Sequence, residues 1–280
     1  MGRKKKFVEM TINEMEFPNK AIGEVDGNLI VAKGGIKGQK VRVMLNRKRK
    51  DYWEGKIVEV LENSPIEIDS ICDCHGVCGG CMYNSITYET ELNIKEEQIK
   101  KLFAREGLDN INFLGIERSP REYGYRNKME YTFGNAVKDG PLILGLHKRG
   151  KFYEVVDMDY CNIVDEDFTN IRKEVMNYFR EKNTPHYNKK NHVGILRHFV
   201  IRKALSTGEI LLNIVTSSQG EIELKELIER INNLKLEGEV VGFIHTINDG
   251  LADTINVDSM EIIYGRDYII EEILRSEEHT

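Results

Sequence analysis

Short runs of alternating hydrophobic and polar residues, separated by turn residues, occupy the first sixty positions of the chain. The alternation predicts five strands, over Phe7–Asn13, Ala21–Val25, Leu29–Ala32, Val41–Leu45 and Tyr52–Leu61. Asp26-Gly27 stands between two of the apolar runs, and this dipeptide is a strong signal for a tight hairpin. Five short strands over about this length are typical of a Greek-key barrel of the OB type, a fold that often binds oligonucleotides. We therefore predict an all-β barrel over residues 1–63.

A helical pattern follows from about Thr87 to Arg105. Apolar residues recur there at helical spacing, and Gly107 stands where a C-terminal cap belongs.

Beyond Pro120 the pattern alternates between strands and helices. Strands are predicted at Leu142–Leu146, Tyr153–Val156, His198–Ala204, Glu209–Val215 and Val240–Ile247, and helices at Asp165–Arg180 and Glu221–Asn233. Ser206-Thr207-Gly208 joins two of these strands as a hairpin. Residues 120–270 therefore read as an α+β domain without internal repeats.

Five cysteines carry the most specific chemistry in the sequence. Cys72, Cys74, Cys78 and Cys81 lie within ten residues, and Cys161 stands alone much later. The spacing Cys72-x5-Cys78-x2-Cys81 with one remote cysteine suits four thiolates around a [4Fe–4S] cluster. A structural zinc ion bound by the same four thiolates is the alternative that spacing leaves open. Cys74 is interpreted as a bystander, because one intervening residue leaves little room for a second ligand beside Cys72.

Cys161 has a second interpretation as a catalytic nucleophile. The nearby carboxylates Asp157, Asp159 and Asp165 argue against it, since negative charge raises the pKa of a thiol.

The charge of the chain is uneven. Its net charge is −6, but residues 1–56 hold 14 Lys/Arg against 7 Asp/Glu, a net +7, and the remainder holds 26 against 39, a net −13. Only the first segment therefore resembles a surface for a phosphate backbone. A solvated lysine-rich face is the other interpretation.

Clusters of cations beside aromatic rings indicate candidate RNA contacts. Charge can hold phosphates while rings stack on unpaired bases. The candidates are Arg47, Lys48, Arg49, Lys50 and Trp53 in the barrel, and Arg126, Lys128, Arg197 and His198 in the later domain. Each has a structural alternative, as a solvated strand face or a packed side chain.

The chain contains no apolar run of membrane-spanning length and no signal peptide, and five cysteines are an odd number for disulfides. We therefore expect a cytoplasmic protein with no membrane contact and no obligate protein partner.

Several stretches resemble, in order, the uracil-C5 RNA methyltransferases that carry an N-terminal TRAM domain and a [4Fe–4S] cluster. The matching stretches are Ile22–Gly27, Ile36–Val41, Cys72–Cys81, Tyr123–Lys128, Asp159–Cys161, Leu196–His198 and Gly265–Ile269. The resemblance covers nearly the whole chain, and the cysteine loop is its most specific part.

The resemblance implies transfer of a methyl group from S-adenosylmethionine to C5 of a uridine in rRNA or tRNA, with 23S rRNA as the expected substrate. A cysteine thiolate first adds to C6 of the uracil, and a base later removes the C5 proton. It also implies that Cys72, Cys78, Cys81 and Cys161 are the cluster ligands. The implied division is a TRAM domain (1–63), an iron–sulfur loop (64–86), a helix with a connector (87–119) and an α+β central domain (120–270).

A Rossmann-like cofactor domain, with the nucleophile and the base, is expected to be missing from this chain. Residues 271–280 are therefore expected to be a truncated or artefactual tail, and the chain is expected to be inactive alone.

Two competing functions remain. Cys74-x3-Cys78-x2-Cys81 has the spacing of radical S-adenosylmethionine enzymes, some of which carry TRAM domains. Such enzymes need a (βα) barrel after the motif, whereas the sequence here reads as α+β. The third possibility is a non-catalytic RNA-binding module.

Overall fold

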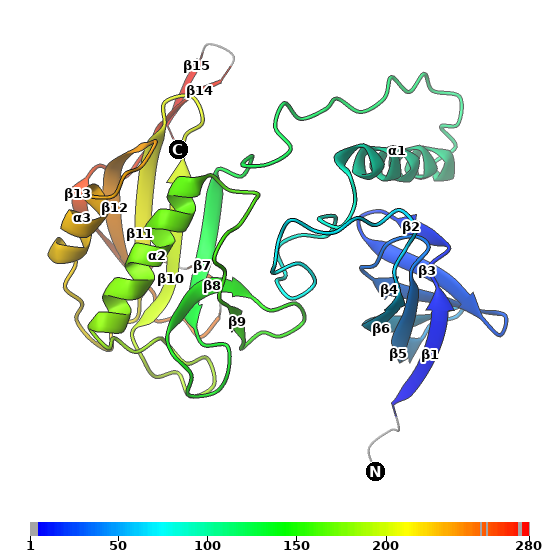
Figure 1. Ribbon diagram of the computed structural model, residues 1–280, viewed down its shortest axis with the longest axis horizontal. Coiled ribbons are helices and arrows are strands. Elements are labelled where there is room, and N and C mark those ends of the chain that lie inside the picture. Colours follow the sequence, from blue (N-terminus) through cyan, green and yellow to red (C-terminus); the bar gives the residue numbers. More distant parts are fainter. Residues whose placement is uncertain (1–4, 253, 256, 274–275, 280) are drawn as a thin grey trace. The chain divides into compact units, whose positions relative to one another are not determined.

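The structure is a computed structural model that describes residues 5–252, 254–255, 257–273 and 276–279, with side chains up to residue 273. The chain divides into two compact units. The first unit contains Met1–Ile71 and Cys81–Pro120, and the second contains Cys72–Gly80 and Arg121–Thr280 (Figure 1). Each unit is therefore built from two separate segments, and the cysteine loop is divided between them.

The first unit contains a six-stranded sheet with the order β1-β5-β6-β4-β3-β2. Its strands are β1 (Lys6–Thr11), β2 (Glu14–Glu16), β3 (Lys20–Val25), β4 (Asn28–Lys33), β5 (Lys40–Lys48) and β6 (Tyr52–Glu62). All pairs are antiparallel except β4 and β6, which run parallel. The sheet adds the short strand β2 to the five strands that the sequence predicts.

The predicted hairpin at Asp26-Gly27 is confirmed. Both residues have positive φ, 50° and 71°, as a type I′ turn requires, and they connect β3 to β4. Apolar residues of alternating positions then meet inside the unit, where Ile12, Ile30 and Val43 are at most 1% exposed. The alternating pattern therefore specifies both the strands and their buried face.

Helix α1 (Tyr88–Arg105) belongs to the first unit. The Thr87 side chain accepts a hydrogen bond from the Thr90 N–H at 3.2 Å and caps its start. Two ion pairs join the helix to β2: Lys101 to Glu14 at 2.6 Å, and Arg105 to Glu16.

The second unit contains a seven-stranded mixed sheet with the order β13-β12-β11-β10-β7-β8-β9 (Figure 1). Its strands are β7 (Lys128–Gly134), β8 (Ile143–His147), β9 (Val155–Val156), β10 (Leu196–Lys203), β11 (Glu209–Thr216), β12 (Glu239–Ile247) and β13 (Ser259–Gly265). β11 and β12 are parallel and are joined through a helix, and the other neighbours are antiparallel. The predicted hairpin of β10 and β11 is confirmed.

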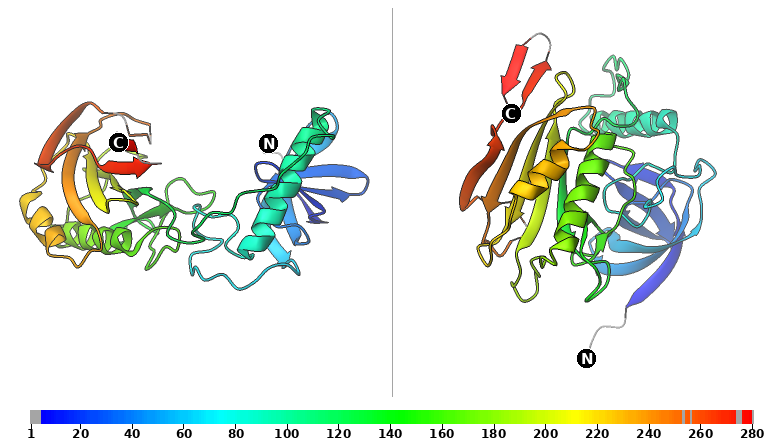
Figure 2. Two further views of the ribbon diagram at one scale, coloured as in Figure 1. Left: turned by 90° about the horizontal axis from the view of Figure 1, so that it is seen from above. Right: turned by 60° about the vertical axis from the view of Figure 1, so that its left-hand side comes forward.

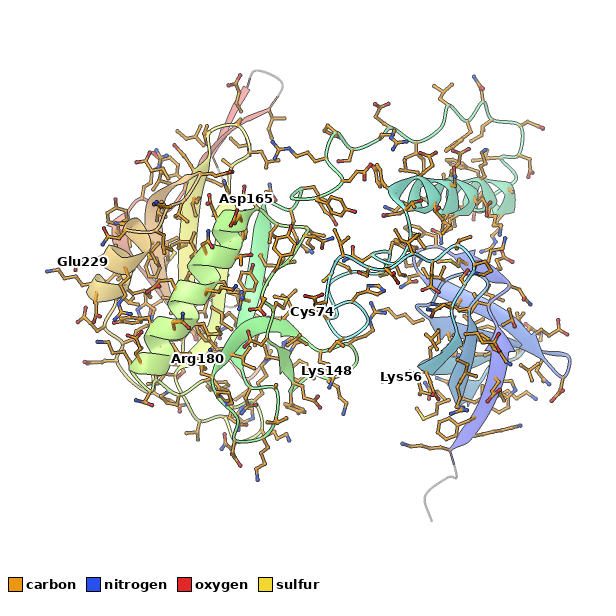
Figure 3. All side chains as sticks on the ribbon, in the orientation of Figure 1. Lys56, Cys74, Lys148, Asp165, Arg180 and Glu229 are labelled. Carbon is orange, nitrogen blue, oxygen red and sulfur yellow. The ribbon has the colours of Figure 1, made fainter. Side chains whose placement is uncertain are left out.

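Helices α2 (Glu166–Glu181) and α3 (Lys225–Asn232) pack side by side on one face of this sheet (Figure 2). Phe179 of α2 meets Phe133 of β7 edge to face, with ring centroids 5.7 Å apart. Figure 3 shows Asp165 at the start of α2 and Arg180 near its end. The Asp165 carboxylate accepts the Asp167 N–H at 2.9 Å, which caps the helix as its acidic start predicts. α3 begins at Lys225, four residues later than predicted.

A hairpin of β14 (Ile270–Ile273) and β15 (Ser276–His279) follows the sheet. The predicted tail at 271–280 overlaps this hairpin, and its residues 274, 275 and 280 lie outside the described part of the chain.

The predicted fold class is wrong at the level of architecture. It described an α+β domain and assigned βαβ structure to a missing domain, whereas β11, α3 and β12 form a parallel βαβ unit in the second sheet. The α3 segment is short and contains few apolar residues. The sequence pattern alone therefore does not show whether the strand after it runs parallel or antiparallel to β11. Within the described residues, no helix is long and apolar enough to cross a membrane.

Candidate functional site

The loop Cys72–Gly80 docks on the end of β8 through its backbone. The Gly79 N–H donates to the His147 carbonyl at 3.0 Å, and the Arg149 N–H donates to the Val77 carbonyl at 2.8 Å. Cys78 forms an isolated antiparallel bridge with Lys148. These contacts hold the loop, in which Figure 3 labels Cys74, to the end of β8 within the second unit.

Two glycines allow this close approach. A Cβ atom at Gly79 would lie 3.2 Å from the His147 carbonyl oxygen, and one at Gly80 would lie 3.4 Å from the Cys78 Sγ. The Gly80 N–H instead donates to that Sγ at 3.3 Å. Gly79 therefore eases the close approach of the loop backbone to the end of β8.

Cys161 lies in the turn between β9 and α2. A buried arginine of α2 binds the backbone of the segment that leads to this turn. Arg172 of α2 is 2% exposed and donates to the carbonyls of Leu144, at 2.8 Å, and Met158. Gly124 N–H donates to the Asn162 carbonyl at 2.9 Å, on the other side of the turn. The Cys161 side chain is 8% exposed.

The Cys72 and Cys78 thiols are close enough to Cys161 to affect the pKa of its thiol. Burial raises the pKa of the Cys161 thiol, backbone N–H donation from Ile163 opposes this, and Cys72 and Cys78 raise it further. Burial also raises the pKa of Cys78, with Gly80 opposing and Cys72 adding to the rise. Cys72 and Cys78 therefore lie within electrostatic range of Cys161.

Cys74 belongs to the same group of thiols. Burial, then Cys72 and Cys78, raise the pKa of its thiol, and Cys161 contributes to the same rise. Its Sγ lies 3.7 Å from the Asp157 carbonyl oxygen. Cys81 is counted with the first unit. Among the described residues, no three His, Cys, Asp or Glu side chains are arranged as a ready metal site.

The donor set nevertheless suits a thiolate-bound metal group. Thiols that raise one another's pKa repel as anions, and a cation among them would remove that repulsion. Backbone N–H donors directed at the sulfurs of Cys78 and Cys161 are partners that such groups use.

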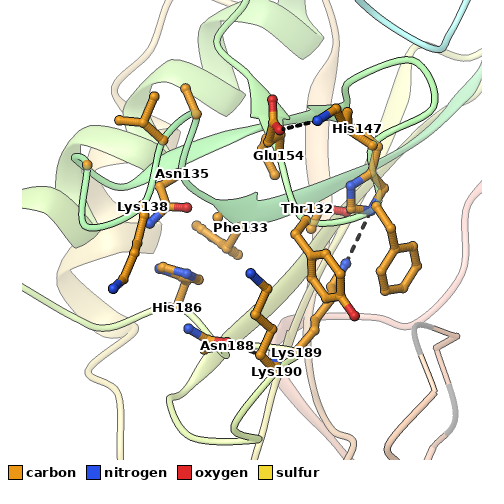
Figure 4. A pocket seen from close by; sticks show the side chains of 18 of the residues that line it. Thr132, Phe133, Asn135, Lys138, His147, Glu154, His186, Asn188, Lys189 and Lys190 are labelled. Carbon is orange, nitrogen blue, oxygen red and sulfur yellow. Dashed lines mark hydrogen bonds and ion pairs between the residues drawn. The ribbon is translucent and has the colours of Figure 1, made fainter. Parts of the chain in front are cut away.

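A cleft of about 750 Å³ lies on the second unit, beside β7 and β8 (Figure 4). It is lined by the β7–β8 connection, the β8–β9 connection and the segment 186–190. Four lysines and two carboxylates line it, so its side chains carry a net charge of +2. These six are Lys138, Lys151, Lys189, Lys190, Asp139 and Glu154.

Aromatic rings line the same cleft and contact its lysines. The His147 and Phe152 rings are stacked, with centroids 5.6 Å apart and planes 12° apart. Lys189 Nζ lies 4.7 Å from the centroid of the Phe152 ring, and Lys190 Nζ lies 5.0 Å from that of Tyr153. The Lys189 ammonium also donates to His147 Nε2 at 3.2 Å, so this nitrogen is the acceptor.

The predicted RNA contacts in the first unit lie at the β5–β6 hairpin. Arg47, Lys48, Arg49 and Lys50 are exposed. The Arg49 guanidinium pairs with the Glu54 carboxylate at 2.8 Å, and Lys48 Nζ lies 5.8 Å from the Trp53 ring. The hairpin therefore places cations beside an aromatic ring, as the sequence predicts.

The four candidates in the second unit differ strongly in exposure. Arg126 is exposed and Lys128 is half-buried, with its ammonium 2.5 Å from the Glu130 carboxylate. Arg197 is 4% exposed and His198 is 5% exposed.

The Arg197 guanidinium serves the fold. It donates to the carbonyls of Asn248, Gly250 and Ala252 at 2.6–2.9 Å, and it lies 4.3 Å from the centre of the Tyr187 ring. We therefore do not include Arg197 and His198 in the candidate RNA surface.

The cleft was not predicted from the sequence. Besides the β7–β8 connection, two stretches that contain both basic and aromatic residues line it, His147–Tyr153 and His186–Lys190. This is the same signal that singled out the β5–β6 hairpin. Nothing in the sequence shows that two such stretches meet.

The chain is similar to several bacterial proteins over 97% of its length. It is 47% identical to a protein of Caldanaerobacter subterraneus subsp. tengcongensis and 48% identical to one of Clostridium tetani, each named an uncharacterized RNA methyltransferase. The chain spans 60% of the length of each of these relatives. No family profile matches the chain.

The fold resembles that of a solved protein. The crystal structure of Pyrococcus abyssi tRNA (uracil-54, C5)-methyltransferase in complex with S-adenosyl-L-homocysteine aligns with 97% of this chain and 58% of that chain. The TM-score is 0.65, and the sequences are 19% identical. The predicted fold class, a barrel and an α+β domain without the Rossmann-like part, is therefore wrong as a description. The chain shares the fold of that methyltransferase along nearly its whole length.

Proposed function

We propose that this chain belongs to an enzyme that transfers a methyl group from S-adenosylmethionine to C5 of a uridine in RNA. The observation that carries the proposal is the 47–48% identity to two proteins named RNA methyltransferases, over 97% of the chain. The shared fold with a tRNA (uracil-54, C5)-methyltransferase narrows the proposal to uracil C5. Ribosomal RNA is the proposed substrate, and tRNA is the alternative to test beside it.

The reaction needs an activated thiol. Uracil C5 is a poor nucleophile, so a thiolate adds to C6, C5 then attacks the methyl group, and a base removes the C5 proton. The pKa values of Cys74, Cys78 and Cys161 are all raised, chiefly by burial, which is opposite to the need of an attacking thiol. We therefore assign none of these three the role of nucleophile, and we propose that the 280-residue chain binds RNA without methylating it.

RNA recognition is proposed for basic residues in each of the two units. The β5–β6 hairpin supplies Arg47, Lys48, Lys50 and Trp53, and the second unit supplies Arg126 and Lys128. Contacts of this kind hold phosphates and splayed bases without fixing the sequence that is bound.

Methyl transfer is the test of this function. The Clostridium tetani relative and the 280-residue chain are each incubated with S-adenosylmethionine and with rRNA or tRNA that lacks 5-methyluridine. The nucleosides are then identified by mass spectrometry. We expect 5-methyluridine from the relative with rRNA and none from the chain. A covalent adduct of the relative with RNA containing 5-fluorouridine, whose C5 fluorine cannot leave as a proton, would report the thiol addition.

Two outcomes would contradict the proposal. Methylation at a position other than uracil C5 would refute the assigned reaction, and 5-methyluridine formed by the chain alone would refute its assigned role. If 5-methyluridine forms only with tRNA, then tRNA and not rRNA is the substrate.

We further propose that Cys72, Cys78, Cys81 and Cys161 bind a [4Fe–4S] cluster. The raised pKa values of the Cys78 and Cys161 thiols, to both of which Cys72 contributes, and the close backbone approach at Gly79 support it for the second unit. Cys81 enters through its spacing from Cys78. When bound, the cluster would supply a cross-link between Cys161 and the loop that starts at Cys72.

A further inference from the structure

The cleft beside β7 and β8 has no role in the reaction proposed above. Its volume of about 750 Å³ falls within the roughly 300–1,000 Å³ of sites that take small ligands. A single nucleotide of a longer strand would fit such a space. The cleft is open at its rim, because Lys138, Lys190, Phe152 and Tyr153 are exposed.

The charge of the cleft favours an anionic ligand. Its lining has a net charge of +2, whereas the chain as a whole has −6. Glu154, one of the two carboxylates, is already paired with Lys148 at 3.0 Å and with Lys151 at 3.3 Å. Lys189 and Lys190 contact the Phe152 and Tyr153 rings, so their ammonium groups and the two rings line the same part of the cleft.

The rings of the cleft favour a flat ligand. The Phe152 side chain is 51% exposed and that of Tyr153 is 53% exposed, which is unusual for two adjacent aromatic residues. Phe152 already stacks on His147, and Phe152 and Tyr153 meet edge to face with centroids 5.3 Å apart. A nucleobase that stacked on either ring would bury apolar surface that now faces water.

Neutral polar groups complete the lining. Burial, with a further contribution from Lys189, lowers the pKa of His186 and so favours the neutral imidazole, which can both donate and accept. The Asn188 side chain is exposed at the same opening, and Figure 4 shows both residues near Lys189 and Lys190. Groups of this kind can pair with the hydrogen-bonding edge of a base.

We propose that this cleft binds one unstacked nucleotide of a single-stranded RNA segment, with its base on Phe152 or Tyr153 and its phosphate at Lys189 and Lys190. The inference rests on the proposed function, since it takes RNA as the ligand. It adds a second recognition site, apart from the β5–β6 hairpin.

Binding of a fluorescent single-stranded oligouridine to the purified chain, followed by anisotropy at several salt concentrations, tests the site. Phe152→Leu keeps an apolar side chain but removes the ring, and we expect it to weaken binding by about fivefold to about 100-fold. Lys189→Ala combined with Lys190→Ala should weaken binding and lower the slope of log Kd against log salt. Each phosphate contact that is lost should reduce this slope by about 0.7.

Matched controls lie elsewhere on the second unit. Tyr264→Leu removes an exposed ring from β13, and Lys225→Ala with Lys235→Ala removes two exposed charges near α3. Both controls should bind the oligonucleotide as the original chain does. Circular dichroism of every variant confirms that the fold is kept, because all of the substituted side chains are at least partly exposed.

Photocrosslinking locates the base directly. An oligonucleotide with 4-thiouridine should crosslink within residues 147–153 or 186–190, as mapped by mass spectrometry of the digested chain.

The outcomes separate the two proposals. If the original chain binds the oligonucleotide while Phe152→Leu and the double lysine variant bind equally well, the cleft is not an RNA site and the proposed function stands. If the folded original chain binds no RNA even at low salt, the role proposed for the chain fails first. An equal loss of RNA affinity in the tyrosine or lysine controls would also overturn the proposed RNA site. It would show that affinity depends only on the number of exposed rings or positive charges.

Discussion

At the scale of single residues, burial separates two arginines that look alike in the sequence. Arg126 and Arg197 both belong to short segments, Tyr123–Lys128 and Leu196–His198, that were predicted to contact RNA. Arg126 is exposed and its Nε donates to the Lys128 carbonyl at 3.2 Å, whereas Arg197 binds three carbonyls from inside the fold. The same residue type therefore has opposite surroundings, and the sequence contains no local sign of the difference.

Replacing Arg197 with Ala should lower the free energy of unfolding by at least about 2 kcal/mol, because it leaves the carbonyls of Asn248, Gly250 and Ala252 without their donor. Urea denaturation followed by circular dichroism measures this loss. Arg126→Ala is the matched control and should change the stability by less than about 0.5 kcal/mol. An equal effect of the two substitutions would contradict the structural role of Arg197.

At the scale of elements, one buried ammonium joins three parts of the second unit. Lys203, at the end of β10, donates to Asp165 at 2.8 Å and to Asp167 at 2.7 Å, both at the start of α2. Asp167 is 1% exposed and also accepts the N–H groups of Glu237 and Gly238, just before β12. The ion group therefore fixes the start of α2 against both strands.

Replacing Lys203 with Met should cost about 3 kcal/mol of unfolding free energy, because the Asp167 carboxylate then stays buried without its cation. Burial lowers the pKa of Lys203, but hydrogen bonds to Asp165 and Asp167 outweigh this and raise it overall. Because the pKa of Lys203 is higher in the folded state, its stabilising contribution is fully present at pH values below the unfolded pKa of about 10.4. This stabilisation is lost as the pH rises through the folded pKa.

Denaturation curves measured from pH 8 to 11 test both effects. The original chain should lose stability at the alkaline end, and Lys203→Met should lack that part of the decline. Lys225→Met, an exposed control on α3, should follow the original chain. A pH profile of Lys203→Met identical to that of the original chain would contradict the assignment.

The sequence predicted elements better than their assembly. Alternation and turn chemistry located β3 and β4 with their hairpin, and β10 and β11, because these features depend on neighbouring residues. The parallel pairing of β11 with β12 was missed, since it depends on how a crossover packs. The cleft was missed for a similar reason: 147–153 and 186–190 are far apart in the sequence and meet only in the folded unit.

At the scale of the whole molecule, the proposed cluster links the stability of the second unit to a metal group. Cys161→Ser should abolish the broad visible absorption of the protein purified without oxygen, and should lower its melting temperature, because the loop is then held to β8 by backbone contacts alone. Cys74→Ser is the control and should keep both properties. A colourless protein that contains zinc would show that the thiols bind zinc and not an iron–sulfur cluster. Loss of colour in Cys74→Ser would show that Cys74 is a cluster ligand.

The division of each unit into two segments has a consequence for the nascent chain. The polypeptide passes from one unit to the other at 71–72, returns at 80–81 and passes over again at 120–121. Because a ribosome makes the chain from its N-terminus, the loop with Cys72, Cys74 and Cys78 emerges well before β8 exists to receive it. During that interval its thiols are open to oxidants. The loop thiols should therefore need reducing conditions already during synthesis, before the second unit has folded.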